Sequence, residues 1–204
     1  MISALLAVVV GALIGLYRGG QLSNLGGLRI ESWPLLGVGV AIPLLVSWTD
    51  PPLGGLFVFI ALGCLIAFAL MNFTLTGMGV VAFGLFLNLI PIMVNGSMPV
   101  SAEAMVRADM ADSIAAATQL DLAAPRHVEQ AGDHLVFLGD TIPIGLFDQV
   151  LSFGDMILLV GLATVVANST RRRPRTEEGQ RVLLPALGGI EPALTNRFQP
   201  NRAI

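Results

Sequence analysis

The sequence predicts an all-α integral membrane protein: a bundle of about five transmembrane helices, an extracytoplasmic helical or irregular segment and a disordered cytoplasmic tail. Hydrophobic residues make up 54% of the chain and charged residues only 12%. A soluble domain carries roughly 25% charged residues. The apolar residues lie in long runs without charge, and the arginines cluster beside particular runs. These three observations favour a chain that crosses a bilayer several times.

The uncharged runs locate the helices, because a hydrocarbon core about 30 Å thick needs roughly twenty residues at about 1.5 Å each. No charged side chain occurs in four runs, residues 1–17, 32–49, 51–102 and 156–170. The third run is long enough for two spans, and the polar stretch Met71-Asn72-Phe73-Thr74 interrupts it. We therefore predict five helices, at Ile2–Tyr17, Pro34–Trp48, Leu53–Met71, Thr74–Val94 and Leu151–Asn168.

These helices divide the chain into four parts. Residues 1–95 hold four transmembrane helices and an interfacial first loop, residues 96–150 form the extracytoplasmic segment, and residues 151–169 form the fifth transmembrane helix. The tail, residues 170–204, contains seven of the eleven arginines and four prolines and has no sustained periodicity. We expect it to be disordered.

The arginines predict the orientation in the membrane, because cytoplasmic loops are enriched in positive charge. Arg18 and Arg29 lie in the first loop, and the cluster Arg171-Arg172-Arg173-Pro174-Arg175 follows the last helix. An odd number of spans places both on one side. We expect that side to be the cytoplasm, with the N-terminus and the acidic segment 96–150 outside, as well as Asp50 in the second loop. The first helix lacks a preceding positive residue and a small-residue cleavage pattern, so we do not expect a secretory signal.

The segments outside the predicted helices have a few local signals. The first loop has a weakly amphipathic strip and ends at Trp33, which is typical of an interfacial segment. Ser101 is placed to cap a helix from Ala102 to about Gln119, and we expect the rest of the outer segment to be irregular. The run His134–Ile144 is too apolar for a solvated loop. It is expected to lie on the membrane surface or over the helix ends, with Gly139 making the turn.

Small residues recur every four positions in the first predicted helix, at Ser3, Ala7, Gly11, Gly15 and Gly19. Such a strip allows the backbone of another helix to approach closely. It predicts either a homodimer seam or packing against the chain's own helices, and we favour the second. Gly77 and Gly84, seven residues apart in the fourth helix, are the expected receiving surface.

Two polar residues within predicted spans, Asn88 and Asp155, form a candidate intramembrane polar site. A polar group in hydrocarbon must find a partner, and an intramembrane carboxylate is by default a functional-site hypothesis. The alternative makes Asp155 a first-turn residue, since Ser152-Phe-Gly-Asp155 resembles a helix-capping sequence. Both residues come out at similar depth, so we expect them to face the bundle interior and to contact each other.

The outer segment holds three further candidate polar residues, His127, His134 and Asp140. Their types invite a metal or acid–base interpretation, but their spacing matches no zinc, hydrolase or phosphate-binding motif. We expect the histidines to be exposed loop residues and expect no metal and no cofactor. The single cysteine, Cys64, lies in an apolar run and is expected to be an inert buried thiol.

Three stretches resemble a known family: Asn95-Gly-Ser-Met-Pro-Val-Ser101, Phe137-Leu-Gly-Asp-Thr-Ile-Pro143 and Leu151-Ser-Phe-Gly-Asp155. Together they are similar to an uncharacterised family of small bacterial membrane proteins, the domain of unknown function DUF5317. The resemblance runs from Met1 to about Asn168 and excludes the arginine-rich tail. It implies a membrane location and an outer segment that is a family feature, and it implies no activity. A bacterial source also fits the complete absence of lysine, which is a compositional association.

These observations favour a non-enzymatic structural or partner-binding component of the cell membrane. Its expected partners are the lipid bilayer and a membrane protein or a second copy of the chain. The net charge of −3 with no lysine indicates no nucleic-acid partner. The alternative is a small transporter or channel component that uses Asn88 and Asp155. A membrane enzyme using His127, His134 or Asp140 is the third and least favoured hypothesis.

Overall fold

The computed structural model describes residues 2–49, 51, 53–123 and 125–171. The predicted disordered tail lies outside the described residues from Arg172 onward, as does Asp50.

Five long helices are present, close to the predicted positions. They are α1 (Ile2–Tyr17), α2 (Trp33–Thr49), α3 (Gly54–Met71), α4 (Met78–Asn95) and α7 (Phe153–Arg171). Of these, α3, α4 and α7 are long and apolar enough to cross a membrane, while α1 and α2 are shorter apolar helices of 16 and 17 residues. Helix α4 begins four residues later than Thr74, because the chain first makes a turn that ends at Gly77 with φ of 109°.

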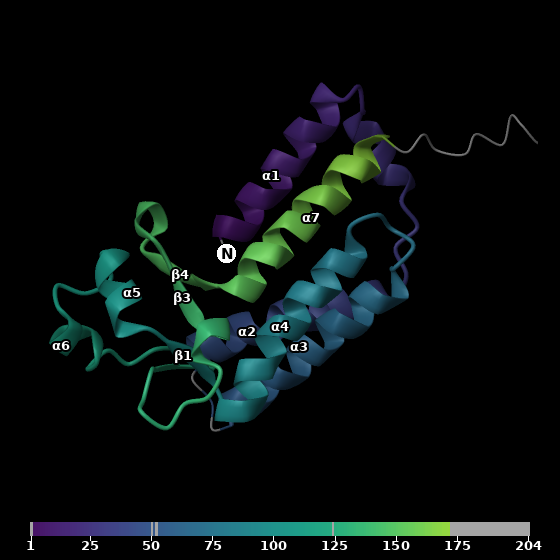
Figure 1. Ribbon diagram of the computed structural model, residues 1–204. Helices are drawn as coiled ribbons and strands as arrows, with labels where there is room; N and C mark the ends of the chain where they lie inside the picture. The colour runs from purple at the N-terminus through teal and green to yellow at the C-terminus, as the bar shows by residue number, and fades with distance from the viewer. Residues whose placement is uncertain (1, 50, 52, 124, 172–204) are drawn as a thin grey trace, which may run out of the picture. The chain divides into compact units, whose positions relative to one another are not determined.

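Helix α7 lies between α1 and α4, with α3 packed on α4 and α2 packed on α3 (Figure 1). Glycines bring these helices together. A Cβ on Gly11 would lie 2.5 Å from the Ala163 carbonyl oxygen, and one on Gly84 would lie 2.6 Å from the Leu158 nitrogen. The predicted small-residue strip therefore packs against the chain's own α7, and Gly77 and Gly84 receive α7 rather than α1.

Gly19 does not belong to this strip, so its assignment as a packing residue was wrong. It follows the end of α1 with φ of +79°, and no atom would lie within 4 Å of a Cβ there. The left-handed conformation is the reason for glycine at this position.

The segment that was predicted to be extracytoplasmic contains a four-stranded sheet, so the expectation of a purely helical or irregular segment was wrong. Its strands are β1 (Met98–Val100), β2 (Arg126–Val128), β3 (Asp140–Ile144) and β4 (Gln149–Ser152), in the order β2-β1-β3-β4. Strand β1 runs parallel to β2 and β3, and β3 and β4 form an antiparallel pair. The strands have three to five residues, too few to show an alternating pattern in the sequence. The fold is mostly helical with this small sheet.

The predicted helix from Ala102 to Gln119 is two short helices, α5 (Ala102–Arg107) and α6 (Ile114–Ala117). Ser101 caps α5 as expected, since its Oγ accepts the Ala104 N–H at 3.4 Å. The helix stops because Asp109 has φ of 58°, a left-handed conformation that an α-helix cannot continue. Both helices pack their alanines and Met105 on β1 and β4, forming a small core of their own.

The remaining short elements are 3-10 helices: η1 (Leu22–Gly27), η2 (Val136–Leu138) and η3 (Gly145–Phe147). Hydrogen bonds fasten the first loop to the helix ends. Buried Asn24 donates to the Thr170 carbonyl at 2.6 Å, and the buried Asn72 amide bonds both the N–H and the carbonyl of Glu31 at 2.9 Å. Trp33, at the start of α2, is 72% exposed.

Gly139 does not make the predicted turn. Its backbone is extended, and it passes so close to the Pro99 carbonyl that a Cβ would clash. Leu135 has the positive φ in this stretch, at 54°. Of the two expected arrangements, the structure has the second, in which the stretch covers the end of a helix. Here η2 packs on α4, and the Asn95 side chain bonds the backbone of His134.

The α1–α7 contact is testable with Gly11→Leu. We expect the leucine to separate the two backbones and to lower the thermal unfolding temperature in detergent, since overpacking of a close contact costs about 1–3 kcal/mol. Gly63→Leu in α3 is the matched control, because a Cβ at Gly63 would meet nothing within 4 Å. Equal unfolding temperatures for both variants would contradict the close contact.

Candidate polar site beneath the outer sheet

Asn88 on α4 contacts Asp155 on α7, as predicted. The Asn88 Nδ2 donates to Asp155 Oδ1 at 2.6 Å, and Asn88 is 8% exposed. The two helices run antiparallel, and Gly154 leaves the space that the Asn88 amide occupies, since a Cβ there would overlap the Asn88 Oδ1. The glycine is therefore required for the contact between these two side chains.

Ser152 joins this pair and starts α7. Its Oγ accepts the Asp155 N–H at 2.9 Å and donates to the Asn88 Oδ1 at 2.7 Å. The Ser152 N–H in turn donates to Asp155 Oδ2 at 3.3 Å. This reciprocal pattern is a capping box with aspartate at the third helical position. Asp155 therefore has both of the roles considered from the sequence. Its Oδ2 caps the start of α7, and its Oδ1 accepts a hydrogen bond from Asn88.

The sheet brings a second carboxylate, Asp140, to the same place. Its backbone on β3 pairs with Ser152 on β4, and its carbonyl accepts the Ser101 N–H at 2.9 Å. The Asp140 side chain is only 1% exposed. Arg126 reaches it from β2, with its Nε 2.9 Å from Asp140 Oδ2.

Asp140 is nevertheless unsatisfied as a hydrogen-bond acceptor. The Arg126 Nε is near enough for an ion pair, but neither Asp140 oxygen has a partner with hydrogen-bond geometry among the described residues. Burial raises the pKa of Asp140 to about 7; the positive charge of Arg126 opposes this rise and the negative charge of Asp155 adds to it. A buried acceptor without a donor is uncommon and calls for a ligand, an ion or a water.

Two cavities adjoin these polar residues. The first has about 280 Å³ and lies against α7 and the start of α1, with Ser3, Asp148 and Leu158 in its lining. The second has about 460 Å³ and is bordered by α2, α3 and α4. Arg126, Asp140 and Asp155 line both cavities. A buried polar cluster therefore lines both a mixed cavity and a mostly apolar one. An apolar lining with a few polar groups is typical of small-molecule sites.

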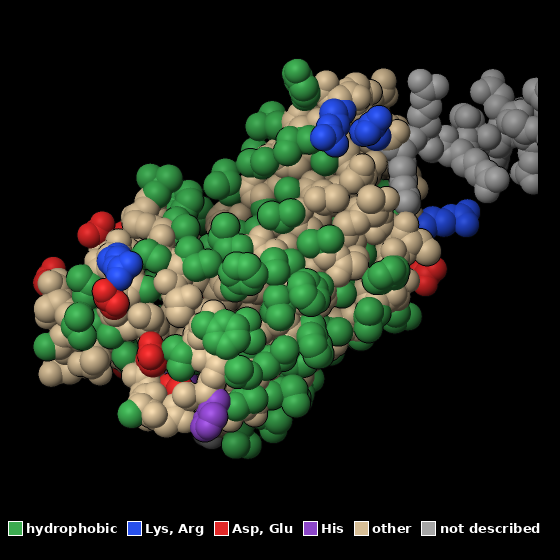
Figure 2. Space-filling model, viewed as in Figure 1, with side chains coloured by type: hydrophobic (Ala, Val, Ile, Leu, Met, Phe, Trp, Pro, Cys, Tyr) green, Lys and Arg blue, Asp and Glu red, His purple; other side chains and the backbone are tan. Residues whose placement is uncertain are grey.

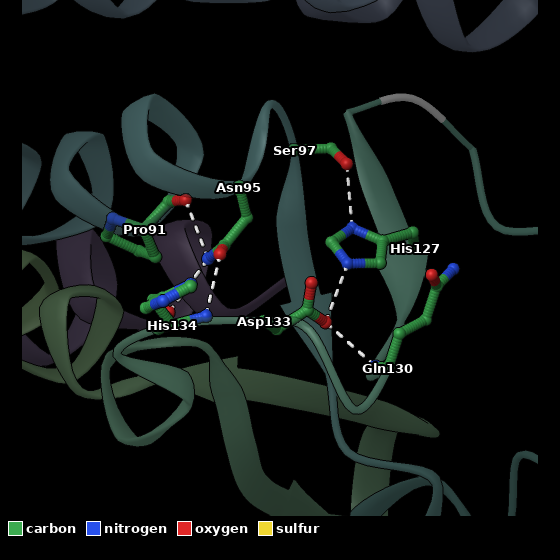
Figure 3. A network of polar contacts seen from close by, with 7 residues as sticks. All are labelled: Pro91, Asn95, Ser97, His127, Gln130, Asp133 and His134. Carbon is green, nitrogen blue, oxygen red and sulfur yellow. Dashed lines mark hydrogen bonds and ion pairs between the residues drawn. The ribbon is translucent and has the colours of Figure 1, made fainter.

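The histidines lie outside this site. His127 belongs to β2 and is partly buried, so the expectation of an exposed loop residue was wrong for it (Figure 3). Its Nδ1 is 2.7 Å from Ser97 Oγ, and its Nε2 is 2.9 Å from Asp133 Oδ2. Burial alone would raise the pKa of Asp133, but the Gln130 N–H and His127 hydrogen bonds outweigh it and lower that pKa.

His134 is exposed as expected, and only its backbone bonds Asn95: the amide nitrogen of Asn95 donates to its carbonyl at 2.9 Å, and its N–H donates back at 2.8 Å (Figure 3). These contacts hold the loop after β2 to the end of α4. Within the described ranges, no group of three metal-ligating side chains is positioned for a metal ion.

Of the predicted candidates, the structure brings together Asn88, Asp155 and Asp140. Sequence analysis missed Arg126. The feature that could have identified Arg126 is its rarity, since Arg107 is the only other arginine in the acidic residues 96–150. Strand β1 pairs with both β2 and β3, which places Arg126 and Asp140 on either side of β1. Strands this short carry no signal in the sequence from which that pairing could be predicted.

The three stretches that carry the family resemblance converge here. Asn95–Ser101 supplies β1 and Met98 in the larger cavity, Phe137–Pro143 supplies Asp140, and Leu151–Asp155 supplies Ser152 and Asp155. The sequence profile of a family of unknown function, DUF5317, matches residues 29–167. The match begins after α1. No match was found among curated proteins or solved structures.

The shared polar cluster is testable with a double-mutant cycle of Asn88→Leu and Asp155→Asn, measured by reversible chemical unfolding in detergent. Because the two side chains are bonded, we expect a coupling larger than about 0.5 kcal/mol, the margin within which independent sites add. Asn88→Leu combined with Glu103→Gln is the control, since Glu103 is exposed on α5 and pairs with Arg107. Additive losses in both cycles would contradict the shared cluster.

Proposed function

The chain belongs to the DUF5317 family, whose function is unknown, and from its polar site we propose that it is a non-enzymatic membrane protein that binds a small amphiphilic molecule beneath its outer sheet. One observation carries the proposal: a buried carboxylate, Asp140, without a hydrogen-bond donor, in the lining of an apolar cavity among the helices.

A membrane location is supported by the surface of the helices. Large hydrophobic side chains are exposed along α1, α2, α3, α4 and α7, an arrangement that water would penalise and lipid would solvate. Figure 2 shows hydrophobic side chains over the helices. Tyr17 and Trp33 are exposed at one end of this region and Trp48 at the other, as in the aromatic belts of membrane proteins.

The charge distribution supports the proposed orientation. Among the described residues visible in Figure 2, most arginines lie at one end of the helices, and most carboxylates lie over the opposite end with α5 and α6. Helices α1 and α7 run parallel, because Gly11 meets Ala163 and Gly15 meets Ala167. We propose that both begin at the outer face and end at the cytoplasmic face, with Arg18 and Arg171 inside.

Binding of a molecule is supported by the energetics of Asp140. Desolvating a carboxylate is costly unless hydrogen bonds or a countercharge compensate it, and Arg126 compensates only one oxygen. A bound donor would compensate the other. The larger cavity, at about 460 Å³, is within the usual range for small-molecule sites of about 300–1,000 Å³. Its apolar lining favours an amphiphile over a fully polar solute.

A small transporter is the second candidate. It is favoured by the fact that Arg126, Asp140 and Asp155 line two cavities rather than one. A binding protein needs only one of these cavities. Movement of a ligand from one to the other would pass this cluster, so flux into proteoliposomes that Asp140→Asn abolishes would distinguish transport from binding.

The orientation is testable by cysteine labelling in a Cys64→Ala background, with a membrane-impermeant maleimide added to intact cells. We expect Gln130→Cys in the outer segment to be labelled. Ser23→Cys in η1 should react only after permeabilisation, although both positions are exposed. The reverse pattern would overturn the proposed orientation.

Binding is testable by filling the larger cavity. Leu44→Trp on α2 places a large ring in the cavity lining, whereas the neighbouring Leu45→Trp, the matched control, lies on a 58% exposed position outside it. Native mass spectrometry after mild-detergent purification should detect a small bound molecule on the wild type and on Leu45→Trp, and less of it on Leu44→Trp. No bound molecule on the wild type, or equal retention by all three proteins, would contradict the proposal.

A further inference from the structure

We propose that the head group bound by this site is a protonated primary amine, with the alkyl chain of the ligand in the cavity between α2, α3 and α4. This inference rests on the proposed function, because it names the chemical class of the molecule that the site binds. The carrying observation is the Asp140 carboxylate, which is 1% exposed and has an oxygen, Oδ1, to which no described residue donates a hydrogen bond.

The charges around this oxygen favour a cation. Asp140 and Asp155 line both cavities, and among the described residues of the two linings Arg126 is the one cation. Asp148 adds a third carboxylate to the smaller cavity. Arg126 has 48% of its side chain exposed, so water screens part of its charge. An anionic head group would face these carboxylates, whereas a cationic one balances the excess negative charge.

The hydrogen bonds favour a donor. A carboxylate only accepts, and an ammonium group supplies three donors and no acceptor. Two of the nearby donors are already engaged, since the Asn88 amide donates to Asp155 and Ser152 Oγ donates to Asn88. A charge-assisted bond from the ligand to Asp140 Oδ1 would supply the missing partner.

The larger cavity favours an alkyl chain. Its lining from the helices is apolar, apart from Asn88 and Asp155 at one end and Ser47, whose Oγ donates to the Leu44 carbonyl at 2.8 Å. The apolar lining consists of Val40, Pro43, Leu44, Val58, Leu62, Leu65 and Ile92. A chain that extends from Asp140 along these side chains would be solvated throughout by hydrocarbon.

Binding of an amine should depend on pH around neutrality, because a proton and the ammonium compete for Asp140. The pKa of Asp140 is about 7, so the carboxylate is mostly protonated at pH 5.5 and mostly charged at pH 8. Among the groups that face it, Arg126 favours the charged form and Asp155 the protonated form. The affinity for the ammonium should therefore rise with pH and level off above the pKa.

The test compares decylammonium, decanol and decanoate, which share one chain length and differ only in the head group. Each is titrated into the full-length protein in lipid nanodiscs at pH 8, and binding is followed through the stabilisation of the protein against thermal unfolding. We expect decylammonium to bind the wild type about tenfold or more tightly than decanol, the scale of a charge-assisted hydrogen bond. Decanoate should bind most weakly.

Two variants separate the carboxylate from nonspecific charge and from partition into the lipid. Asp140→Asn should remove the preference for the ammonium and its rise in affinity between pH 5.5 and 8. Asp121→Asn, an equal change of charge at an exposed residue outside both cavities, should keep both. If Asp140→Asn fails to fold, Leu44→Trp should instead weaken the binding of decylammonium and of decanol, while Leu45→Trp does not.

The outcomes distinguish the two proposals. Equal or tighter binding of decanol or decanoate to the wild type would overturn the amine assignment and leave the binding function intact. Binding of none of the three probes would overturn both. An unchanged preference in Asp140→Asn would show that the head group lies elsewhere and would also overturn this inference.

Discussion

The structure depends on the hydrogen bonds that join Asn88, Ser152 and Asp155. They begin α7, since Ser152 and Asp155 satisfy N–H groups that a helix start leaves without intrahelical partners. They also fix α7 against α4, because the Asn88 amide bonds both residues. Helix α7 in turn contacts α1 on one side and α4 on the other. Loss of this cluster would therefore loosen the helix that joins α1 to the rest of the bundle.

The glycines make this arrangement sterically feasible. Gly154 leaves room for Asn88, Gly84 and Gly161 let α4 and α7 touch through backbone atoms, and Gly11 does the same for α1. Close approach suits a lipid environment, where association of helices relies on van der Waals contact and hydrogen bonds rather than on removal of apolar surface from water. The small-residue pattern and the polar cluster thus act on the same helix, α7. The glycines allow its backbone to approach α1 and α4, and the hydrogen bonds of Asn88 fix its position along α4.

The helices and the contact between Asn88 and Asp155 were predictable from the sequence, because both follow from local rules. Uncharged runs of fixed length define helices, and polar residues at similar depth need partners. The sheet was not predictable. Its strands pair residues as distant as Met98 and Arg126, and three-residue strands carry no periodic signal. Asp140 was recognised as a candidate for its type alone, and its proximity to Asp155 depended on the pairing of β3 with β4.

The contrast between the two carboxylates indicates which part of the cluster serves the fold and which part serves a ligand. Asp155 has a donor for each oxygen, so its role in starting α7 and bonding Asn88 accounts for its presence. Asp140 is more deeply buried and lacks such donors, and an apolar residue of similar size would avoid its desolvation. Its backbone bonds alone would hold β3 between β1 and β4. Burial opposes the charge of Asp140 and backbone bonds already hold its strand, so the ligand that we propose is the most direct explanation for a carboxylate at this position.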